Sequence, residues 1–290
     1  MSSSTPRLWV VSTPIGNLGD ISSRAKQVLQ EADLLLAEDT RVSGQLLHRL
    51  QLGHRPFLSL HAHNEQKRIP QVLSQLEQGK TLALLSSAGE PVISDPGYLL
   101  VRACRQAGYR VSPVPGPSAV TAALSCSGLP AQPFTFLGFL PRRPGDIRKL
   151  LLNFSRLPTT LVFFQRKSRL VQSLKLAYNV LGPREACLAR ELTKEHEELI
   201  SLVLGQWDRL PEIPRGEFTV VLAPAAAGQE QKTPCEGVLD LLQQVKGNQT
   251  SAKELAREVS SQVQGWSTKE VYNLWLRNSS QEQAGDAGPD

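Results

Sequence analysis

Short apolar segments alternate with helical segments throughout the first half of the chain. The apolar segments have the length of buried strands and lie at 8–12, 34–37, 57–60, 81–85 and 110–114. The segments between them have helical periodicity and lie at 22–32, 40–50, 65–78 (interrupted near Pro70), 99–107 and 117–126. This alternation predicts a mostly parallel sheet with helices on both faces.

The second half, after Leu129-Pro130, predicts a different sheet. We expect further strands and helices at 134–140, 147–154, 159–164 and 170–181, and strands around Ala186, Leu199 and Val220. This order favours a mixed sheet, and short helices follow between 237 and 277. We therefore divide the chain into an N-terminal α/β domain (1–130), a second α/β domain (131–224), a small C-terminal helical domain (235–278) and a disordered tail (279–290).

Composition and the length of the apolar runs exclude several classes of protein. The chain has 290 residues, 40% of them hydrophobic, so it can bury a core without disulfides or a structural metal. Its apolar runs are far shorter than the roughly 20 residues of a membrane-spanning helix, and the N-terminus lacks the pattern of a signal peptide. The four cysteines are scattered, which is typical of a reducing compartment. We therefore expect a cytoplasmic protein.

Three loops in the first half are rich in glycine and proline. They are TPIGNLGD at 13–20, SSAGEPVISDPG at 86–97 and PVPGPSA at 113–119. Each follows a predicted strand, and ligands of open α/β sheets bind where the strands end. Glycine lets the backbone approach a ligand, proline keeps a loop rigid, and the helix N-terminus after each loop offers free N–H groups. Any one loop alone fits an ordinary turn, but the three together predict a ligand cleft.

Several motifs for other ligands are absent from the sequence. It contains neither GxxxxGK[ST], which cradles the phosphates of nucleotides, nor the dinucleotide fingerprint GxGxxG. It also lacks GxSxG, CxxC and any cluster of metal ligands, since His61 and His63 stand without further ligands. We therefore expect no metal site.

Positive charge is concentrated in one stretch, which we call the basic block. Between Pro141 and Lys175 there are nine basic residues and one acid, Asp146, so the block carries +8. The whole chain carries +5, which leaves −3 for the remainder. A basic block on a nearly neutral body is typical of a surface that binds a polyanion, and a solvated charged face is the alternative.

Eight motifs occur in an order that resembles one known group of enzymes. They are TPIGNLGDIS (13–22), AEDTR (37–41), HNE (63–65), SAGEPVISDPG (87–97), VPGPSA with SGLP (114–119 and 127–130), GFLPRR (138–143), ARELTK (189–194) and RGEFTVV (215–221). The chain resembles the tetrapyrrole-methylase superfamily. Within it, the motifs resemble the family of ribosomal RNA small subunit methyltransferase I, which methylates the 2′-oxygen of a cytidine in 16S rRNA.

This resemblance implies a two-domain α/β fold, usually a homodimer, that binds S-adenosylmethionine. That cofactor has a carboxylate, an adenine and a sulfonium but no phosphate, which suits loops of glycine and proline. By motif, the resemblance implies that it binds Pro14, Gly16, Asn17, Ala88, Gly89, Pro91, Gly116, Pro117, Ser118 and Ala119.

The implied reaction is an in-line displacement, in which the ribose 2′-oxygen attacks the methyl group. The protein mainly aligns the reacting atoms, and a nearby carboxylate or imidazole assists the loss of the hydroxyl proton. Candidates for this base are Glu38, Asp39, His63, Glu65 and Asp95, and Asp39 is preferred, followed by Glu38 and Glu65 as catalytic residues. The alternative role of Asp39 is that of a helix N-cap.

The implied partner is 16S rRNA of the small ribosomal subunit, which we expect to bind the basic block. Bases of single-stranded RNA stack on aromatic rings and arginine planes, and Phe139 is the candidate aromatic. The other substrate-binding candidates are Arg41, His63, Arg142, Arg143, Arg166, Arg169, Arg190 and Lys194. Glu191 and Lys194 either close the cleft or form a salt bridge. Trp266 and Trp275, in the C-terminal helices, are expected to lie in a core rather than to stack on bases.

Two segments depart from the family pattern. The usual SDAGTP loop reads SSAGEP, with Ser87 for an aspartate and Glu90 for a threonine. The usual YESxHR segment reads FQRKSR, which replaces a glutamate and a histidine by Gln165 and Ser168 and adds two positive charges. These changes leave open a catalytically inactive, RNA-binding or ribosome-binding paralogue. A methylase of a tetrapyrrole precursor is the other alternative, against which the AEDTR, GFLPRR and ARELTK motifs stand.

Overall fold

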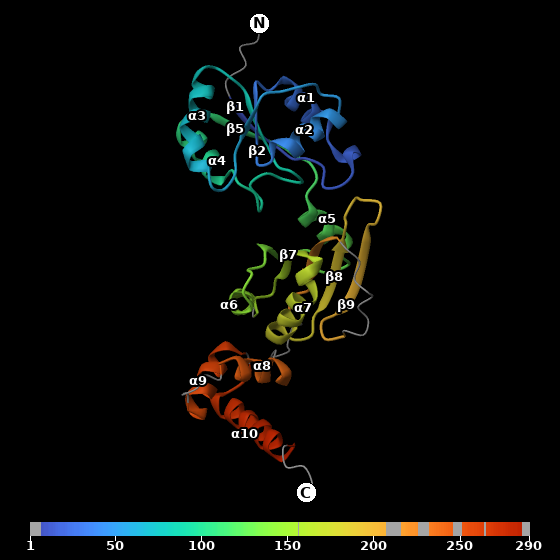
Figure 1. Ribbon diagram of the computed structural model, residues 1–290. Coiled ribbons are helices and arrows are strands. Elements are labelled where there is room, and N and C mark those ends of the chain that lie inside the picture. The colour runs from blue at the N-terminus through green and yellow to red at the C-terminus, as the bar shows by residue number, and fades with distance from the viewer. Residues whose placement is uncertain are drawn as a thin grey trace. The chain divides into compact units, whose positions relative to one another are not determined.

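The computed structural model describes residues 7–155, 157–206, 216–225, 232–245, 251–263 and 265–285. The chain forms two compact units: unit 1 comprises Met1–Ala122 and Glu191–Glu197, and unit 2 comprises Ala123–Arg190 and Glu198–Asp290. Each unit contains one five-stranded sheet, and Figure 1 labels their elements in chain order. Part of unit 1 is thus an insertion in the sequence of unit 2.

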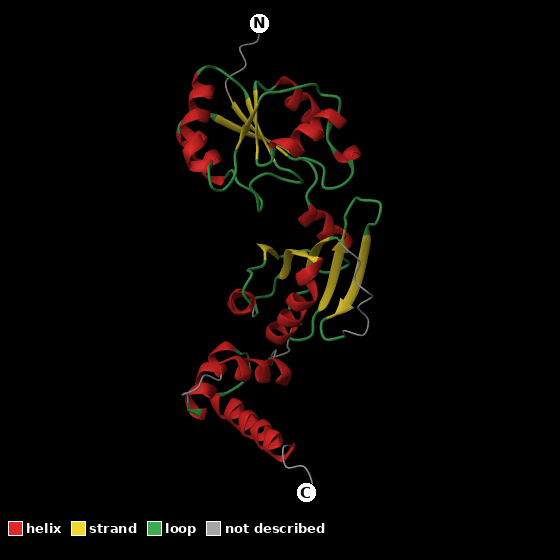
Figure 2. Ribbon diagram, viewed as in Figure 1, coloured by secondary structure: helices red, strands yellow, loops and turns green. Residues whose placement is uncertain are grey.

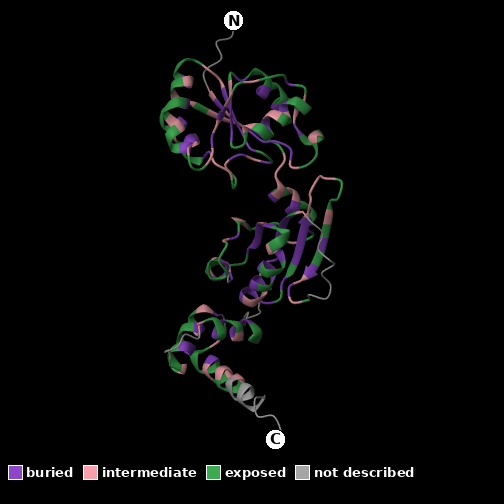
Figure 3. Ribbon diagram, in the orientation of Figure 1, coloured by how far each residue is buried: buried purple, intermediate pink, exposed green. Residues whose placement is uncertain are grey.

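Unit 1 contains the parallel sheet that the alternating pattern predicted. Its strands are β1 (Arg7–Val11), β2 (Leu34–Ala37), β3 (Phe57–Ser59), β4 (Leu82–Leu85) and β5 (Arg110–Val114), in the order β3-β2-β4-β1-β5, and they pair in parallel. Helices α1 (Ser23–Glu31) and α2 (Thr40–Arg49) pack on one face, and α3 (Glu65–Glu77) and α4 (Tyr98–Gln106) on the other (Figure 2). Strand β4 and most of β2 are buried between these layers (Figure 3), which explains their apolar sequences.

Helix α3 is continuous, so the expected interruption near Pro70 is wrong. Pro70 lies inside the helix, which begins after Asn64 and ends at Glu77. A proline removes one backbone hydrogen bond and crowds the preceding turn. Val72 and Leu76, which follow it, are fully buried in the core beneath α3 and α4, and this packing holds the helix together.

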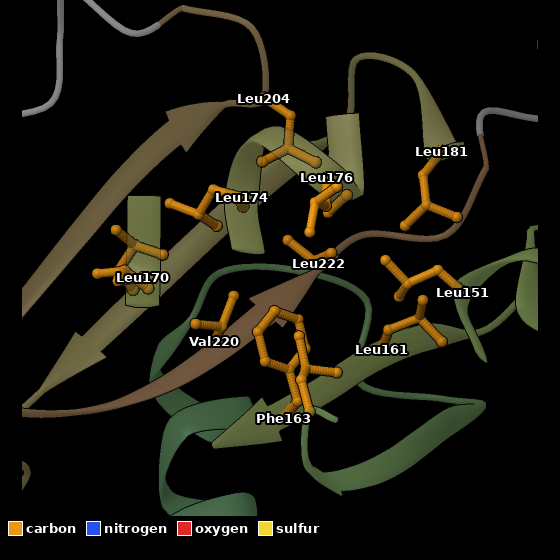
Figure 4. Close-up of a cluster of buried hydrophobic side chains, with 14 of the residues drawn as sticks. Leu151, Leu161, Phe163, Leu170, Leu174, Leu176, Leu181, Leu204, Val220 and Leu222 are labelled. Carbon is orange, nitrogen blue, oxygen red and sulfur yellow. The ribbon is translucent and has the colours of Figure 1, made fainter. Parts of the chain in front are cut away.

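Unit 2 contains a mixed sheet, also as predicted. Its strands are β6 (Phe134–Phe139), β7 (Thr160–Arg166), β8 (Glu185–Arg190), β9 (Glu198–Val203) and β10 (Glu217–Leu222), in the order β6-β7-β10-β8-β9. Strands β6 and β7 pair in parallel and the other neighbours are antiparallel. Helices α6 (Pro144–Phe154) and α7 (Lys167–Leu181) pack on one face and bury the leucine-rich cluster of Figure 4 around Phe163.

Three further helices lie in the C-terminal part of unit 2: α8 (Cys235–Val245), α9 (Ala252–Gln262) and α10 (Thr268–Gly285). They share a core of their own, against which Trp266 and Trp275 pack half-buried, which confirms the expected role of these rings. Helix α10 extends to Gly285, so 279–285 are helical and not part of a disordered tail. Their sequence SSQEQAG contains good helix formers, and 286–290 lie outside the described residues.

The C-terminal helices attach to α7 and α6 through polar contacts. The Asn179 side chain donates a hydrogen bond to Asp240 Oδ2 at 2.9 Å, and Gly237 of α8 lies directly against Asn179. Arg148 of the basic block is buried and donates to the side chain of Gln244. One residue of the predicted polyanion-binding block therefore joins two parts of unit 2 instead of facing solvent.

Helix α5 (Ala119–Cys126) contains the division between the units, since unit 1 ends at Ala122 and unit 2 begins at Ala123. The sequence placed the first domain boundary later, at 130. Residues 225–234 separate the expected second and third domains, and most of them lie outside the described residues. Within the part of the chain that is described, no helix is long and apolar enough to cross a membrane.

Candidate active site

The three glycine- and proline-rich loops meet at the carboxyl ends of β1, β4 and β5, which are neighbours in the sheet. Thr13 and Gly89 exchange two backbone hydrogen bonds of 2.9 and 3.0 Å, which join the first loop to the second. The Thr13 hydroxyl also contacts Ser86, whose own hydroxyl donates to the Gly89 carbonyl at 2.7 Å. The third loop joins them through Ser12, whose N–H donates to the Val114 carbonyl. The loops that the sequence singled out therefore form one site.

Gly116 and Ser12 form a close contact at the centre of this site. A Cβ atom on Gly116 would lie 2.9 Å from Ser12 Cβ, closer than two carbon atoms can approach without repulsion. Ser12 is 2% exposed, and its hydroxyl has no hydrogen-bond partner among the described residues. A buried hydroxyl without a partner costs free energy unless a ligand or water satisfies it. This place thus combines close backbone approach with an unsatisfied polar group, and both features suit a ligand.

The second loop has an unusual backbone. Val92 has a φ of 74° and Ser94 a φ of 68°, and Gly89 and Gly97 also lie at positive φ. A β-branched residue such as valine rarely adopts this conformation, because its Cβ crowds the backbone. Such strain is concentrated at ligand clamps and active sites, where the surrounding structure maintains it. The conformation of this loop supports its assignment to the binding site.

The segment Glu191–Glu197, which belongs to unit 1, packs against the first loop. Asn17 N donates to Thr193 Oγ1 at 3.0 Å, and a Cβ on Gly16 would lie 2.5 Å from Lys194 Cγ. Lys194 forms a salt bridge of 3.2 Å with Glu191, the alternative that the sequence left open for this pair. The structure therefore brings Lys194, a substrate candidate, against Gly16, and Thr193 against Asn17, so the segment contacts two cofactor candidates.

The remaining cofactor candidates lie in the same three loops and differ in how far their side chains are exposed. Pro14 and Pro91 are buried beneath the loops, and Ala88 is exposed. Pro117, Ser118 and Ala119 are half-buried and lead into helix α5, whose first N–H groups point back to the third loop. Free N–H groups at a helix start attract a carboxylate.

The carboxylates predicted from sequence have different roles in the structure. Asp39 caps helix α2, since its side chain accepts hydrogen bonds from the N–H groups of Arg41 and Val42 at 2.9 and 3.3 Å. Glu65 is buried, and its Oε1 accepts from Leu100 N of helix α4 at 3.0 Å. Both carboxylates therefore stabilise helix starts. Glu38 is exposed beside Asp39, at the end of β2.

Asp95 and Glu38 form the electrostatically unusual pair of unit 1. Asp95 belongs to the strained second loop after β4, and Glu38 follows the neighbouring strand β2. Burial, and then the nearby negative charge of Glu38, raise the pKa of Asp95 from 3.8 to about 6. A carboxylate with a pKa near neutrality is a better proton acceptor than an ordinary one. Sequence reasoning named Asp95 as a candidate but ranked it below Asp39, because the pairing with Glu38 depends on strand order.

The arginines of the basic block gather at one edge of the second sheet. Strands β6, β7 and β8 run in the same direction, so the residues at and after their carboxyl ends lie at one edge. Arg142, Arg143 and Arg166 are exposed there, and the Arg169 side chain donates to the Arg142 carbonyl at 3.0 Å. Arg156, which was counted in the block, lies outside the described residues.

The other substrate candidates are more dispersed. Arg190, at the same edge, forms a salt bridge of 3.5 Å with Glu198 and is largely buried. Arg41 and His63 belong to unit 1, where both are exposed. The ring of His63 contacts that of His61 edge-on, with centroids 6.1 Å apart. The described residues contain no group of three or more side chains that could hold a metal ion.

The residues that depart from the family pattern differ in their burial and contacts. Gln165 is buried, donates to Ser173 Oγ at 2.6 Å and accepts from Arg166 N at 3.0 Å. The neutral amide thus bonds to both the serine and the start of α7. Ser87 is exposed and Glu90 is half-buried in the second loop.

Ser12 is a site residue that sequence reasoning missed. Its only signal in the sequence is that it is a polar residue at the end of an apolar strand.

Comparison with known proteins identifies relatives of the whole chain. The family model described as Tetrapyrrole (Corrin/Porphyrin) Methylases matches residues 7–208. A protein of Xylella fastidiosa (strain Temecula1 / ATCC 700964) named "Ribosomal RNA small subunit methyltransferase I" is 44% identical over 89% of this chain and 96% of its own length. Proteins of the same name from Escherichia coli O157:H7 and Mesorhizobium japonicum are 42% and 38% identical, over 87% and 98% of this chain and 90% and 96% of their own lengths.

Solved structures share the fold at lower identity. The methyltransferase CobJ matches with a TM-score of 0.56 and 19% identity, over 76% of this chain and 95% of that one. Uroporphyrin-III C-methyl transferase from Thermus thermophilus, in a complex with S-adenyl homocysteine, matches with a TM-score of 0.52 and 21% identity, over 75% of this chain and 97% of that one. These matches agree with the α/β fold expected from the sequence.

Proposed function

The chain belongs to the tetrapyrrole (corrin/porphyrin) methylases and, within them, to the ribosomal RNA small subunit methyltransferase I family, and on this basis we propose that it methylates the 2′-oxygen of a cytidine in 16S rRNA of the small ribosomal subunit. The observation that carries the proposal is the identity of 38–44% with relatives of that name over about nine tenths of the chain or more. The specificity for a cytidine 2′-oxygen and a homodimeric state are parts of the proposal.

The methyl donor is S-adenosylmethionine, and the residues of unit 1 fit it. When bound, it supplies an electrophilic methyl group on a positively charged sulfur. Gly116 and Gly89 allow the three loops to pack closely around Ser12, and the unsatisfied hydroxyl of Ser12 offers a hydrogen bond to the donor. The N–H groups at the start of α5 suit its carboxylate. The loops need no lysine cradle, since this donor carries no phosphate.

Methyl transfer to a hydroxyl forms a carbon–oxygen bond, breaks a carbon–sulfur bond and releases the hydroxyl proton. We assign the acceptance of this proton to Asp95, supported by its raised pKa of about 6. Burial and then the negative charge of Glu38 make Asp95 more basic, and Asp39 and Glu65 hold the starts of helices α2 and α4. A group with this pKa is ionised at neutral pH and returns the proton to water after the reaction. The rest of the barrier is lowered by alignment of the reacting atoms.

The rRNA substrate binds the exposed arginines at the edge of the second sheet. Arg142, Arg143 and Arg166 contact phosphates, and Arg169 holds the turn that carries Arg142 in place. Since ribosomes are the substrate, the proposed reaction takes place in the cytoplasm.

The test is methyl transfer from labelled S-adenosylmethionine to isolated small ribosomal subunits that lack the modification. The methylated nucleotide is mapped by its resistance to alkaline cleavage, which a 2′-O-methyl group confers. Label in one cytidine of 16S rRNA is the expected result. Label in a nucleotide other than a cytidine contradicts the cytidine assignment, and label on a base contradicts the 2′-oxygen assignment.

Two further measurements separate the alternatives. Cofactor binding by calorimetry without transfer to any ribosomal acceptor, together with transfer to uroporphyrinogen III, contradicts the rRNA proposal in favour of a tetrapyrrole substrate. Binding of small subunits without any cofactor affinity favours the inactive paralogue. In that case Ser87 and Glu90 are the first residues to restore to aspartate and threonine.

A further inference from the structure

An aromatic cluster lies on the face of the second sheet that is opposite to the leucine-rich core. The rings of Phe136 and Phe164 contact each other edge-on, with centroids 4.9 Å apart, and Phe139 contacts Phe164 at 5.3 Å. Phe163 and Leu161, which alternate with Phe164 along β7, point into the core on the other side. This cluster is therefore separate from the core that α6 and α7 cover.

A β-bulge in β6 places Phe139 in the cluster. Phe136 pairs with Val162 and Phe139 pairs with Phe164, so β6 has one residue more than β7 between these pairs. Without the extra residue, Phe139 would point to the opposite face, because side chains alternate along a strand. Gly138, at a φ of 66°, supplies the left-handed conformation that such a bulge requires. The local structure thus directs a large apolar side chain to a face where it stays exposed.

Phe139 is 57% exposed, whereas the middle of the same face is covered. Val221 and Cys187, which the strand register places on this face, are 0% and 1% exposed. Phe134, at the start of the edge strand β6, is also exposed. The aromatic cluster is therefore an exposed end of a face whose middle is buried, and the Phe139 ring packs against Phe164. The edge strand β9 also exposes Leu199 and Ser201 on this face.

Positive charge borders the aromatic cluster. Arg166 lies two residues beyond Phe164 in β7, on the same face, with Glu217 of β10 opposite it in register. Arg142 and Arg143 follow Phe139 after β6, and both are exposed. The Arg169 side chain donates to the carbonyl of Arg142 and so holds this turn against α7. An exposed ring next to several arginines is the combination that binds single-stranded nucleic acid.

We propose that Phe139, supported by Phe136 and Phe164, is a stacking platform for a base of single-stranded RNA whose phosphates contact Arg142, Arg143 and Arg166. The proposal rests on the rRNA methylation proposed above and adds a binding residue to it. A second copy of the chain is the rival occupant of this face. In a two-fold symmetric interface each patch faces its own copy, so the same arginines would oppose one another, and this repulsion favours RNA.

The test measures binding of a fluorescein-labelled, single-stranded oligoribonucleotide, roughly 12 nucleotides long, by anisotropy at several salt concentrations. Phe139→Ala is compared with Phe139→Tyr, which keeps the aromatic face. The matched control is Leu157→Ala, since Leu157 is 46% exposed and precedes β7, at the other edge of the sheet. Thermal unfolding and light scattering check that each variant is folded and has the oligomeric state of the wild type.

We expect Phe139→Ala to weaken RNA binding roughly tenfold, the loss of one stacked base, while Phe139→Tyr and Leu157→Ala bind as the wild type does. The slope of log affinity against log salt should stay unchanged in Phe139→Ala, because no charge is removed. Arg142→Ala with Arg143→Ala should lower that slope by roughly 1.4, at about 0.7 for each phosphate contact on a single strand.

Three outcomes overturn the inference. Equal affinity of Phe139→Ala and the wild type removes the stacking role and leaves the methylation proposal intact. A changed oligomeric state in a folded Phe139→Ala variant assigns the face to a second copy of the chain. If the wild type and Phe139→Ala methylate small subunits with the same KM, the platform is not used. Absence of both RNA binding and methyl transfer in the wild type instead refutes the proposed function itself.

Discussion

Substitution of Gly116 by alanine tests the packing at the centre of the cofactor loops. The added Cβ would lie 2.9 Å from Ser12 Cβ, whereas nonbonded carbon atoms favour separations of about 3.5–4.0 Å. Both atoms are attached directly to the backbone, so no side-chain rotation relieves the contact. The third loop must therefore move away from the end of β1 by several tenths of an ångström or more.

Overpacking of this kind typically costs about 1–3 kcal/mol, which is roughly a 5- to 150-fold change in an equilibrium constant. Since the loop is closer to the surface than β1, we expect the cost to appear mainly as weaker S-adenosylmethionine binding, measured by titration calorimetry. Urea unfolding measures any part that appears as lost stability. Gly44→Ala is the matched control, because a Cβ there meets nothing within 4 Å and α2 gains a better helix former.

A double-mutant cycle makes the cause specific. Ser12→Gly removes the atom that the new Cβ meets, and the next atoms, Ser12 O and C, lie at 3.5 and 3.7 Å, which are ordinary contacts. The pair Ser12→Gly and Gly116→Ala should therefore be less damaging than the sum of the two single changes. Additive effects in the cycle, or an unchanged cofactor affinity in Gly116→Ala, would refute the assignment of this contact to the cofactor site.

Further predictions concern three charged side chains. In the wild type, methyl transfer should fall as pH drops through about 6, where Asp95 gains its proton, and Asp95→Asn should lose most activity together with this inflection in the pH–rate profile. The raised pKa also means that the folded state binds the proton more tightly than the unfolded chain does, so the free energy of unfolding should fall as pH rises from 3.8 to about 6. In Asp95→Asn, the free energy of urea unfolding should depend less on pH in this window. Glu65→Ala should lower stability by about 1–3 kcal/mol in urea unfolding, because the buried Leu100 N–H loses its acceptor. Glu65→Gln should keep both stability and methyl transfer. A Glu65→Gln variant that is stable but inactive would assign Glu65 a catalytic role. Arg184 donates from its buried side chain to the carbonyls of Ser155 and Ala223, so Arg184→Ala should lower stability by about 3 kcal/mol in the same assay, whereas the exposed Arg142→Ala should not.

The sequence predicted the elements of both sheets because their signals are local. Apolar runs of strand length and helical periodicity depend on neighbours within a few residues. They placed β1 to β7 to within one or two residues, and each residue named for the last three strands lies inside its strand. The two clear errors, at Pro70 and at 279–285, have different origins. Helix α3 is held by the burial of Val72 and Leu76, which outweighs a proline, and composition alone underestimated the extent of α10.

The candidate site was predictable in its segments but not in its contacts. The glycine and proline loops and the basic block are visible in sequence, because their composition is unusual over a short stretch. The role of Asp39 as a cap and of Glu65 as the acceptor for Leu100 N appears only when helix starts are placed in space. The basic block likewise divides into exposed arginines and the buried Arg148, which its sequence pattern does not distinguish.

The sequence by itself determined the fold class, the loops that carry the site and the family to which the chain belongs. Tertiary structure alone decided which distant groups meet: Asp95 with Glu38, Gly116 with Ser12, and the segment Glu191–Glu197 with the loop at Gly16. It also decided, through one extra residue in β6, that Phe139 shares a face with Phe164. Secondary structure follows from short-range interactions, whereas these contacts depend on strand order and register, which bring together residues that are far apart along the chain.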